Sequence, residues 1–295
     1  MNNQKCFIVV DGNSFIYRAY HATKHLNMTT LDGFSTGAIN GVLNMIHSLV
    51  FRFIEVPIIM VFDDEGDSFR KELYPEYKAN RKAPPDELIA QLPAIHDLVR
   101  AMGLPILIEP GVEADDVIGT LAQDAIDNDH LLLICTGDKD MAQLVCDNVR
   151  LCDTMRHTTT CRQVVINKFG VTPEQIIDYL ALVGDAVDNI PGLKGVGAKT
   201  AAQLLSAMDS LDNIFDNIDD VRKLPIRNAD AIADSLIEHK DIVKLSQTLA
   251  TIKRDVPLDV TLDTIEYADI EPESLYELIH FYELETNPMI GRLLR

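Results

Sequence analysis

Short apolar runs alternate with amphipathic helical stretches through the first half of the chain. Residues 7–10, 58–62, 104–108 and 131–135 are apolar runs of strand length. Between them, apolar residues recur at three- and four-residue spacing, as they do between Asp86 and Gly103. Continuous apolar strands that alternate with helices are typical of a parallel sheet covered on both faces. We therefore predict an α/β fold with a mostly parallel central sheet flanked by helices.

Acidic residues follow these apolar runs. In open sheets of this kind, ligands bind beyond the carboxyl ends of the strands. Asp11 follows the first run, Asp63 the second and Asp138 the fourth, while the third leads into residues 111–119, which hold three carboxylates within four positions at an expected helix start. The helix dipole explains one acid in a first turn, but it does not explain three. We expect separate segments to deliver carboxylates to one rim of the sheet.

Such a cluster of acids predicts a metal site, because like charges at close range raise one another's pKa and destabilise a fold that holds no cation. The candidate metal ligands are Asp11, Asp63, Glu113, Asp115, Asp116, Asp138, Asp140, Asp185 and Asp188. Ligation by oxygen alone favours Mg²⁺ or Mn²⁺ over zinc. Two ions would activate a water and stabilise the leaving oxygen of a phosphoryl displacement. The eight histidines show no ligand spacing, and no nucleophile elbow or P-loop is present.

The segment 69–85 is the most basic and most proline-punctuated part of the chain, and it interleaves Lys and Arg with aromatic residues. This composition suits a nucleic-acid strand with exposed bases, since rings stack on bases while cations hold phosphates. The alternative is a solvated loop whose tyrosines pack on the core, and we favour that alternative for Tyr74.

Beyond Arg162 the pattern becomes mostly helical. Residues 184–205 form a glycine-punctuated turn between two helices, and this turn resembles a helix-hairpin-helix. Glycines let a backbone approach a phosphate, and the N–H groups at a helix start supply an anion site. An ordinary glycine-rich connection is the alternative, but the neighbouring lysines favour DNA. The candidate DNA contacts in this turn are Gly192, Lys194, Gly195, Gly197, Lys199 and Thr200.

The composition of the chain limits its expected location, cysteine chemistry and partners. The chain is 47% hydrophobic without an apolar run near twenty residues, and its start lacks a signal-peptide pattern, so we expect a cytoplasmic protein without a membrane partner. Five scattered cysteines argue against a disulfide framework or a zinc knuckle. A net charge of −20, from 46 acids and 26 bases, by itself argues against a nucleic-acid partner. Bound divalent cations would neutralise part of that charge locally. The distribution of charge, and not its total, therefore decides whether a nucleic-acid partner is excluded.

Six ordered motifs carry a family resemblance. They are Val10–Ser14, Tyr17–His21, Tyr77–Arg81, Gly111–Gly119, Thr136–Asp140 and Gly184–Thr200. Together they closely resemble the 5′-nuclease domains of the flap endonuclease family, of the kind found in bacterial DNA polymerase I. The resemblance extends to about residue 285. It implies a PIN-like α/β nuclease core at 1–168, with a helical arch at about 70–100, and a helical C-terminal lobe at 169–295 with a helix-hairpin-helix-type motif at about 184–205.

The resemblance also implies a function. The family comprises structure-specific, metal-dependent 5′ nucleases, both 5′→3′ exonucleases and flap endonucleases, which act as monomers on DNA with a 5′ flap, nick or junction and on RNA–DNA primers in replication and repair. By motif match, Lys78 and Arg81 would polarise the scissile phosphate and Tyr77 would stack on the unpaired nucleotide. Arg18 and Arg70 would contact phosphates nearby. The hairpin would hold duplex DNA, with a K⁺ ion at its carbonyls.

Two other functions remain in view. One is a catalytically silent module that binds flap junctions, which the loss of an acid from the cluster would support. No such loss occurs, because every family position for a metal-binding acid is acidic here. The other is a nuclease of RNA, or another phosphohydrolase, on the same α/β core. The hairpin and the basic, aromatic segment argue against that function.

Overall fold

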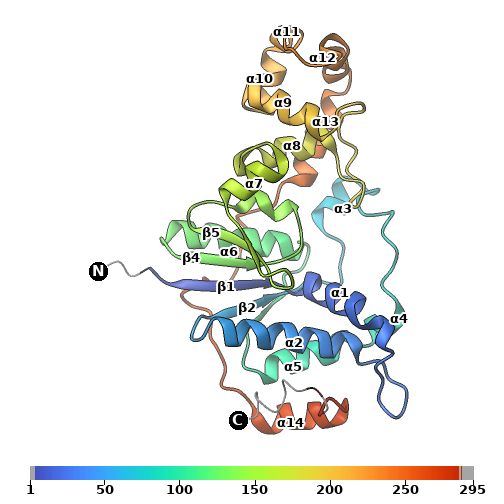
Figure 1. Ribbon diagram of the computed structural model, residues 1–295, viewed down its shortest axis with the longest axis vertical. Coiled ribbons are helices and arrows are strands. Elements are labelled where there is room, and N and C mark those ends of the chain that lie inside the picture. Colours follow the sequence, from blue (N-terminus) through green and yellow to red (C-terminus); the bar gives the residue numbers. More distant parts are fainter. Residues whose placement is uncertain (1–3, 286, 288–295) are drawn as a thin grey trace.

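A six-stranded sheet lies at the centre of the first half of the protein. The computed structural model describes residues 4–285 and 287 (Figure 1). The strand order is β3-β2-β1-β4-β5-β6. The strands are β1 (Cys6–Asp11), β2 (Ile58–Val61), β3 (Ile106–Leu107), β4 (Leu131–Cys135), β5 (Val149–Asp153) and β6 (Thr158–Thr160). All neighbouring pairs are parallel except β5 and β6, which are antiparallel. The predicted, mostly parallel sheet is confirmed.

Helices cover both faces of this sheet, which explains why its inner strands are apolar without interruption. On one face Ile8 and Val10 of β1 pack with α1 (Gly12–Thr23), α2 (Gly37–Arg52) and α5 (Leu92–Ala101). On the other face Phe7 and Val9 pack with α6 (Ala114–Asp127). Side chains of successive residues of β1 therefore pack on opposite faces of the sheet, as the pleat of a strand requires.

A helical lobe continues the α6 side of the core and lies above the sheet (Figure 1). It contains α7 (Arg162–Phe169), α8 (Ile176–Val183), α9 (Ala198–Met208), α10 (Leu211–Asp216), α11 (Ile218–Val221), α12 (Ala229–Glu238) and α13 (Lys240–Ala250). Short 3₁₀ turns are η1 (Lys24–Leu26), η2 (Asp140–Leu144) and η3 (Pro173–Gln175). No helix among the described residues is long and apolar enough to cross a membrane.

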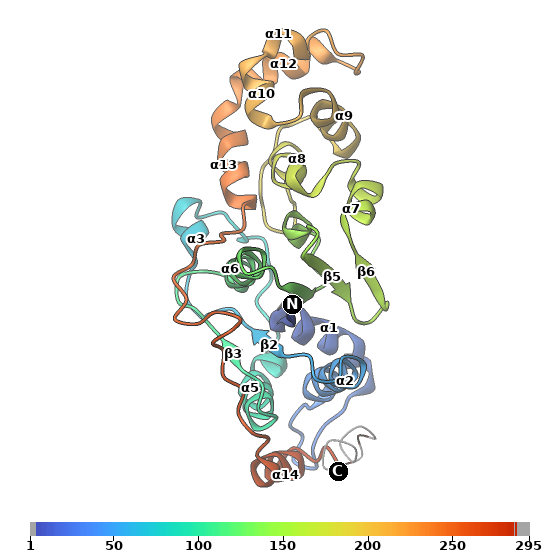
Figure 2. The same cartoon turned by 90° about the vertical axis from the view of Figure 1, so that its left-hand side faces the viewer.

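The end of the chain returns to the α/β core, although the expected division into 1–168 and 169–295 places it with the helical lobe. After α13 the chain runs back along the α/β core to α14 (Pro272–Phe281), which packs beside α5 (Figures 1 and 2). Leu275 and Ile279 of α14 are buried in the same apolar cluster as α2 and α5. The amide of Glu271 also donates to the carbonyl of Ala101 (2.9 Å). Residues 286 and 288–295 lie outside the described residues.

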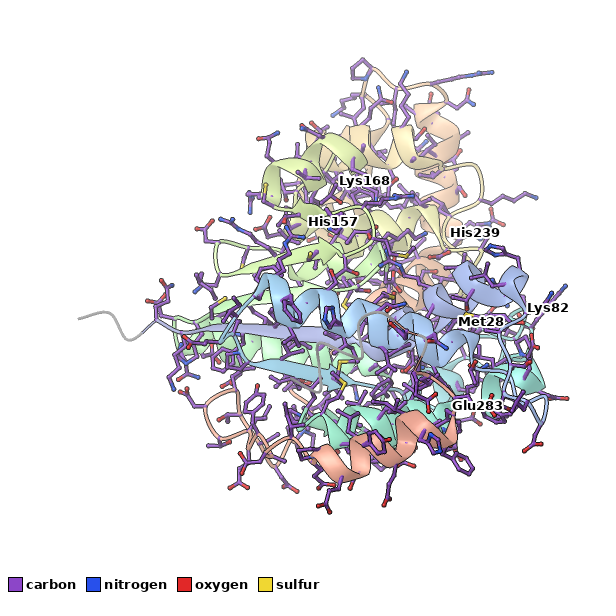
Figure 3. All side chains as sticks on the ribbon, turned by 60° about the horizontal axis from the view of Figure 1, so that its bottom comes forward. Met28, Lys82, His157, Lys168, His239 and Glu283 are labelled. Atoms are coloured by element: carbon purple, nitrogen blue, oxygen red, sulfur yellow. The ribbon has the colours of Figure 1, made fainter. Side chains whose placement is uncertain are left out.

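The predicted helical arch at about 70–100 is also different in the structure. Only α3 (Phe69–Leu73) and α4 (Asp86–Ile89) are helical before α5, and the residues between them form turns and an extended stretch through Pro84 and Pro85. Proline disfavours helix in the residue before it, which explains the break. The last third of the predicted arch belongs to the core instead, because α5 buries Ile95, Leu98 and Val99 against the sheet. Lys82, within the extended stretch, projects into solvent (Figure 3).

Candidate active site

A polar cleft of about 290 Å³ opens at the carboxyl ends of the parallel strands. Its lining residues are Asp11, Asn13, Ser14, Tyr17, Asp63, Lys78, Arg81, Glu113, Ala114, Asp115 and Asp138. These residues come from the ends of β1, β2 and β4, from α1, from the turn after α3, and from the start of α6. Carboxylates from separate segments therefore meet at one rim.

Two of these carboxylates are fixed by helix starts. Asp11 is the N-cap of α1, where it accepts hydrogen bonds from the amide of Ser14 (2.9 Å) and the hydroxyl of Thr136 (2.7 Å). Asp63 accepts from the first amide of α6, that of Ala114 (2.7 Å), and from the side chain of Asn13 (2.8 Å). An unsatisfied N–H at a helix start attracts an anionic group. The two helix starts thus hold the first two strand-end acids in place.

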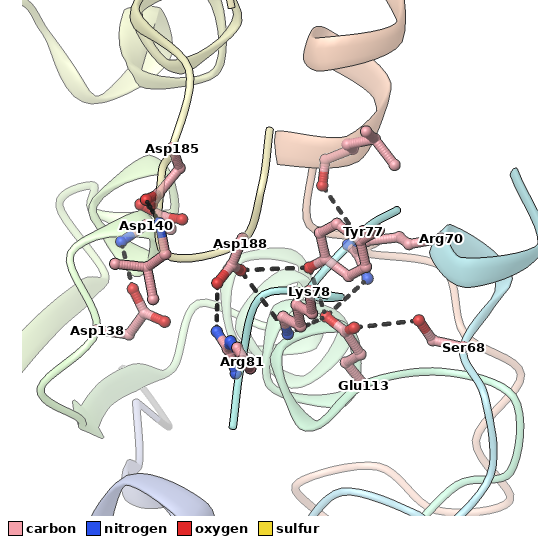
Figure 4. Close-up of polar contacts among 12 residues, drawn as sticks. Ser68, Arg70, Tyr77, Lys78, Arg81, Glu113, Asp138, Asp140, Asp185 and Asp188 are labelled. Carbon is pink, nitrogen blue, oxygen red and sulfur yellow. Dashed lines mark hydrogen bonds and ion pairs between the residues drawn. The ribbon is translucent and has the colours of Figure 1, made fainter. Parts of the chain in front are cut away.

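Glu113 is the N-cap of α6 and carries the most contacts in the cleft. Its carboxylate accepts from the hydroxyls of Ser68 (3.1 Å) and Tyr77 (3.1 Å), and the ammonium of Lys78 lies 3.1 Å away (Figure 4). Lys78 also lies 3.8 Å from Asp188. The basic segment after α3 is therefore folded onto the start of α6.

A second group of acids lies beside Glu113. Figure 4 shows Asp138, Asp140 and Asp185 together on one side of the view, and Asp188 between them and Glu113. The carboxylate of Asp138 accepts from the amide of Asp140 (2.8 Å). Asp188 forms an ion pair with Arg81, and Asp185 lies 2.8 Å from the ammonium of Lys139. These ion pairs tie the basic segment and the loop after β4 to the turn after α8.

Several of these carboxylates have raised pKa values. Burial raises the pKa of Asp11 to about 6, and the neighbouring Asp138 and Asp63 add to the rise. Burial, with Asp138 and Asp185 nearby, raises the pKa of Asp140 to about 8. The pKa of Asp115 lies well above its usual range for the same reasons, burial first and then Asp138 and Asp11. The fold thus disfavours the charged forms of these carboxylates, first through burial and then through repulsion between neighbouring acids.

The donor set fits a hard divalent cation, because it consists of carboxylate oxygens and excludes nitrogen and sulfur. One such oxygen, Oδ1 of Asp140, is buried and finds no hydrogen-bond partner in the described part of the chain. Even so, no three His, Cys, Asp or Glu side chains of the described residues converge closely enough to form a ready-made metal group. The side chains of Lys78, Arg81 and Lys139 are paired with these acids instead. The chain's own cations therefore neutralise part of the charge of these acids.

Two predicted site residues do not face the cleft. Arg70, expected to contact phosphate, is 2% exposed and donates two hydrogen bonds of 2.7 Å to Asp116. Asp116, expected as a metal ligand, is 0% exposed, and its carboxylate points to Arg70. A buried charge needs a partner, and these two residues neutralise each other. Neither side chain reaches the cleft in this structure, and a contact of either one with phosphate or metal stays a prediction.

Tyr77 is also placed differently from the prediction. Its ring is 4% exposed and lies in the core that includes α6, so it has no open face for a nucleotide. Its hydroxyl donates towards Glu113 (3.1 Å) and Asp188 (3.4 Å). Tyr77 supports the acids rather than stacking on a base. Arg18 is ion-paired with Asp153, and its predicted phosphate contact stays a prediction.

The cleft contains residues that the sequence reasoning missed. Asn13 and Tyr17 line it from α1, and Tyr17 is 40% exposed. The sequence held a signal for them, because positions four apart lie on one face of a helix and both residues lie in the helix that starts after the strand-end Asp11. Among the residues that line the cleft, Tyr17 is the one with an aromatic ring.

The turn between α8 and α9 has the geometry expected of a tight hairpin. Gly184 and Gly192 have positive φ angles of 75° and 63°, and a Cβ on Gly192 would lie 2.4 Å from the amide nitrogen of Gly184. Only glycine allows backbones to pass this closely. Lys194, Gly195 and Lys199 are exposed, Thr200 is half-buried, and a Cβ on Gly197 would meet no described atom within 4 Å. The start of α9 is therefore open to a ligand, while contact with DNA stays a prediction.

Sequence profiles match almost the whole chain. The N-terminal resolvase-like domain of 5′-3′ exonucleases matches residues 6–170, and their C-terminal SAM fold matches residues 171–273. The chain is 47% identical over 294 residues to DNA polymerase I of Pseudomonas aeruginosa, which covers 99% of this chain but 32% of that protein. It therefore spans about a third of that polymerase. It is 38% identical over 259 residues to a 5′-3′ exonuclease of Buchnera aphidicola, covering 88% of this chain and 90% of that one.

Solved structures share the fold. The T5 D15 protein crystallised with metal ions has a TM-score of 0.71 at 20% identity, covering 94% of this chain and 100% of that one. The catalytic core of Rad2 in complex with a DNA substrate has a TM-score of 0.64 at 15% identity, covering 100% and 93%. The arrangement of an α/β core with a helical lobe is thus common to these proteins.

Proposed function

Because this chain belongs to the 5′-3′ exonuclease family of metal-dependent nucleases, we propose that it hydrolyses DNA phosphodiesters at or near a 5′ flap, nick or junction. The observation that carries this proposal is the cleft itself. It combines buried carboxylates with raised pKa values and two cations of the basic segment, Lys78 and Arg81. Carboxylates that hold divalent ions beside cations that hold a phosphate are the parts that phosphodiester hydrolysis needs.

The residues of the cleft have separate roles in this proposal. Asp11, Asp63, Glu113, Asp115 and Asp138 line it and would hold Mg²⁺ or Mn²⁺, with Asp140, Asp185 and Asp188 completing the second group. Bound ions would lower the pKa of a water and stabilise negative charge on the leaving oxygen. Lys78 and Arg81 would turn from the carboxylates towards the scissile phosphate. The T5 D15 protein was crystallised with metal ions, which supports the ion requirement.

Tyr17 takes the stacking role that was predicted for Tyr77. An exposed ring beside the carboxylates suits the base of an unpaired nucleotide, since every base offers a π face. Asn13, which lines the cleft with Tyr17, is held in place by hydrogen bonds with Asp63.

The hairpin between α8 and α9 would hold the duplex part of the substrate. Its exposed amides and the side chains of Lys194 and Lys199 suit phosphates, and its carbonyls suit a K⁺ ion. Rad2 was crystallised with a DNA substrate, which supports a DNA partner. RNA–DNA primers as substrates, a monomeric state and a cytoplasmic location in replication and repair belong to the same proposal.

A labelled flap duplex tests the proposal. The protein should release short 5′-labelled products in Mg²⁺ and none in EDTA, and an Asp115→Asn variant should release none in either. A matched duplex without a flap or nick measures the dependence on structure. Binding of the flap without any cleavage in Mg²⁺ or Mn²⁺ would contradict the proposal and favour a silent junction-binding module. Faster cleavage of unstructured RNA would favour the RNA nuclease.

A further inference from the structure

Residues 249–253 comprise the last two residues of α13 and the three that follow, and we call them the backing segment. Arg70 donates its Nε to the carbonyl of Leu249 (2.9 Å) and its Nη2 to the carbonyl of Thr251 (2.7 Å). Asp116 accepts from the amide of Lys253 (2.8 Å). A backbone that belongs to the helical lobe is thus bonded to two buried side chains of the α/β core.

These two side chains lead to Glu113 at the cleft. Asp116 accepts from the amide of Glu113 (3.2 Å), which closes the capping box of α6. Arg70 reaches the Glu113 carboxylate itself, with its Nη1 at 3.3 Å from Oε2. Glu113 is therefore held from behind through its backbone and through its side chain.

On the other side, Gln143 connects the same backing segment to the second group of acids. Its side-chain amide donates to the carbonyls of Ala250 (2.9 Å) and Asp140 (3.1 Å), and its oxygen accepts from the amide of Ile252 (3.0 Å). Gln143 is 4% exposed, so water does not compete for these bonds. The backbone of Asp140, and with it the point from which its carboxylate extends, is thus fastened to the same five-residue segment that fastens Glu113.

The backing segment has no room to shift towards α6. A Cβ on Gly119 of α6 would lie 2.4 Å from the carbonyl oxygen of Lys253, a distance that real side chains do not reach. Glycine at this position lets the backbone lie directly on the helix. The segment is therefore a fixed spacer between the start of α6 and the start of η2.

We propose that Arg70, Asp116 and Gln143 are positioning residues, which use the backing segment to hold the Glu113 and Asp140 carboxylates at a fixed spacing for divalent cations. Carboxylates that repel one another would otherwise move apart. Hydrogen bonds behind metal ligands fix the ligands and raise metal affinity, and losing one lowers affinity about 10- to 100-fold. Asp116 then acts through Glu113 and does not itself coordinate the ion. The role of the cations in this inference rests on the proposed function.

Direct binding of Mn²⁺, followed by the electron paramagnetic resonance of the free ion, tests the inference without using activity. Gln143→Met and Asp116→Asn should each weaken Mn²⁺ binding about 10-fold or more. Arg70→Met and Asp116→Leu, made together, remove both buried charges at similar volume, so the double variant should keep its fold. Its affinity for Mn²⁺ should nevertheless be lower than that of the parent protein.

Two matched controls separate positioning from stability. Gln175→Met removes a glutamine that also donates to two backbone carbonyls, those of Leu205 (3.1 Å) and Asp209 (2.8 Å), far from the cleft. Lys5→Met with Asp263→Leu removes an exposed ion pair. Both controls should bind Mn²⁺ as the parent protein does, even where they lower the melting temperature.

A double-mutant cycle adds a second readout. If Asp116 and Gln143 act through one shared segment, the losses of Mn²⁺ affinity from Asp116→Asn and Gln143→Met should not add. Amide exchange at residues 113–116 should also rise in Gln143→Met, although Gln143 touches none of them. Unchanged Mn²⁺ affinity in these variants, or losses no larger than those of the controls, would overturn the inference. A parent protein that binds Mn²⁺ but cuts no flap would overturn the proposed function and leave this inference standing.

Discussion

The ammonium of Lys78 lies 3.1 Å from Oε2 of Glu113, so the protein places its own cation beside the carboxylates of the cleft. Lys78 is held there by its backbone, which adopts a left-handed φ of 55° and donates to the carbonyl of Asp188 (2.9 Å). Its side chain is 23% exposed and lines the cleft. A phosphate that enters the cleft would meet this ammonium next to the acids.

Replacing Lys78 with alanine should lower the rate of flap cleavage about 100- to 1000-fold, because the ammonium stabilises charge that develops in the transition state. The Michaelis constant should change far less. Single-turnover rates over a range of enzyme concentrations separate the two effects. Lys82→Ala, which removes a lysine that projects into solvent, serves as the control. A loss confined to binding would assign Lys78 to substrate affinity.

Asp115→Asn should abolish cleavage in Mg²⁺, a loss of about 1000-fold or more, because the variant loses a charged ligand in the cleft. DNA binding in EDTA should stay equal or become tighter, since a charge that repels phosphates is removed at the same time. Fluorescence anisotropy with a labelled flap duplex measures this binding. Asp86→Asn, an exposed acid at the start of α4, is the matched control. Turnover near that of the parent protein would exclude Asp115 from the ligands.

The metal-free protein should lose stability as the pH rises from about 4 to about 8. Asp11 and Asp140 have folded pKa values of about 6 and about 8, above the value of about 3.9 for an unfolded aspartate. The fold therefore favours their protonated forms, and this contribution to the free energy of unfolding is lost as the pH rises through the folded pKa values. Mg²⁺ should restore it, with a larger rise in melting temperature at pH 8 than at pH 5.5. Equal rises would contradict the prediction.

Tyr17→Ala should weaken binding of substrates with an unpaired 5′ nucleotide about 10-fold, which is the scale of one base stacked on a ring. Tyr17→Phe keeps the ring and should behave like the parent protein. Binding of a fully paired nicked duplex should change less, because fewer unpaired bases are available. Anisotropy titrations with the two substrates make the comparison. An equal loss for both substrates would point to a general packing defect.

Lys199→Ala should weaken duplex binding and lower the slope of log Kd against log salt by about 1, since one phosphate contact is removed. Lys223→Ala in the same lobe removes a lysine that is already paired with Asp220 and serves as the control. Its salt slope should equal that of the parent protein. An unchanged slope for Lys199→Ala would remove the hairpin from the DNA interface.

The strand-end acids could be predicted from the sequence because a parallel sheet brings the carboxyl ends of its strands to one edge. That rule needs only the order of apolar runs, and it placed Asp11, Asp63 and Asp138 correctly around the cleft. The directions of the acids in the first turn of α6 are harder to predict. Asp115 and Asp116 are neighbours in sequence, yet successive residues of a helix differ in direction by about 100°. One therefore faces the cleft and the other faces Arg70, and which is which depends on tertiary packing.

The sequence also does not show against which surface a segment packs when its partners are far away along the chain. The basic segment 69–85 has the composition of a loop that binds a nucleic-acid strand. Two of its residues are buried instead. Tyr77 donates hydrogen bonds to Glu113 and Asp188, and Arg70 donates one to the end of α13. The apolar positions of α14 predict a helix face without saying which surface covers it. Only the structure shows that this face covers α5.

The polypeptide crosses between the α/β core and the helical lobe twice, upwards between β6 and α7 and back down through the backing segment. The downward passage is bonded to Arg70 and Asp116 of the core and lies against Gly119. One apolar cluster also continues from α6 into the lobe. The lobe is therefore joined to the core by packing and hydrogen bonds as well as by the chain. A duplex bound at the α9 hairpin would approach the carboxylates in an orientation that this packing sets before any contact with the acids is made.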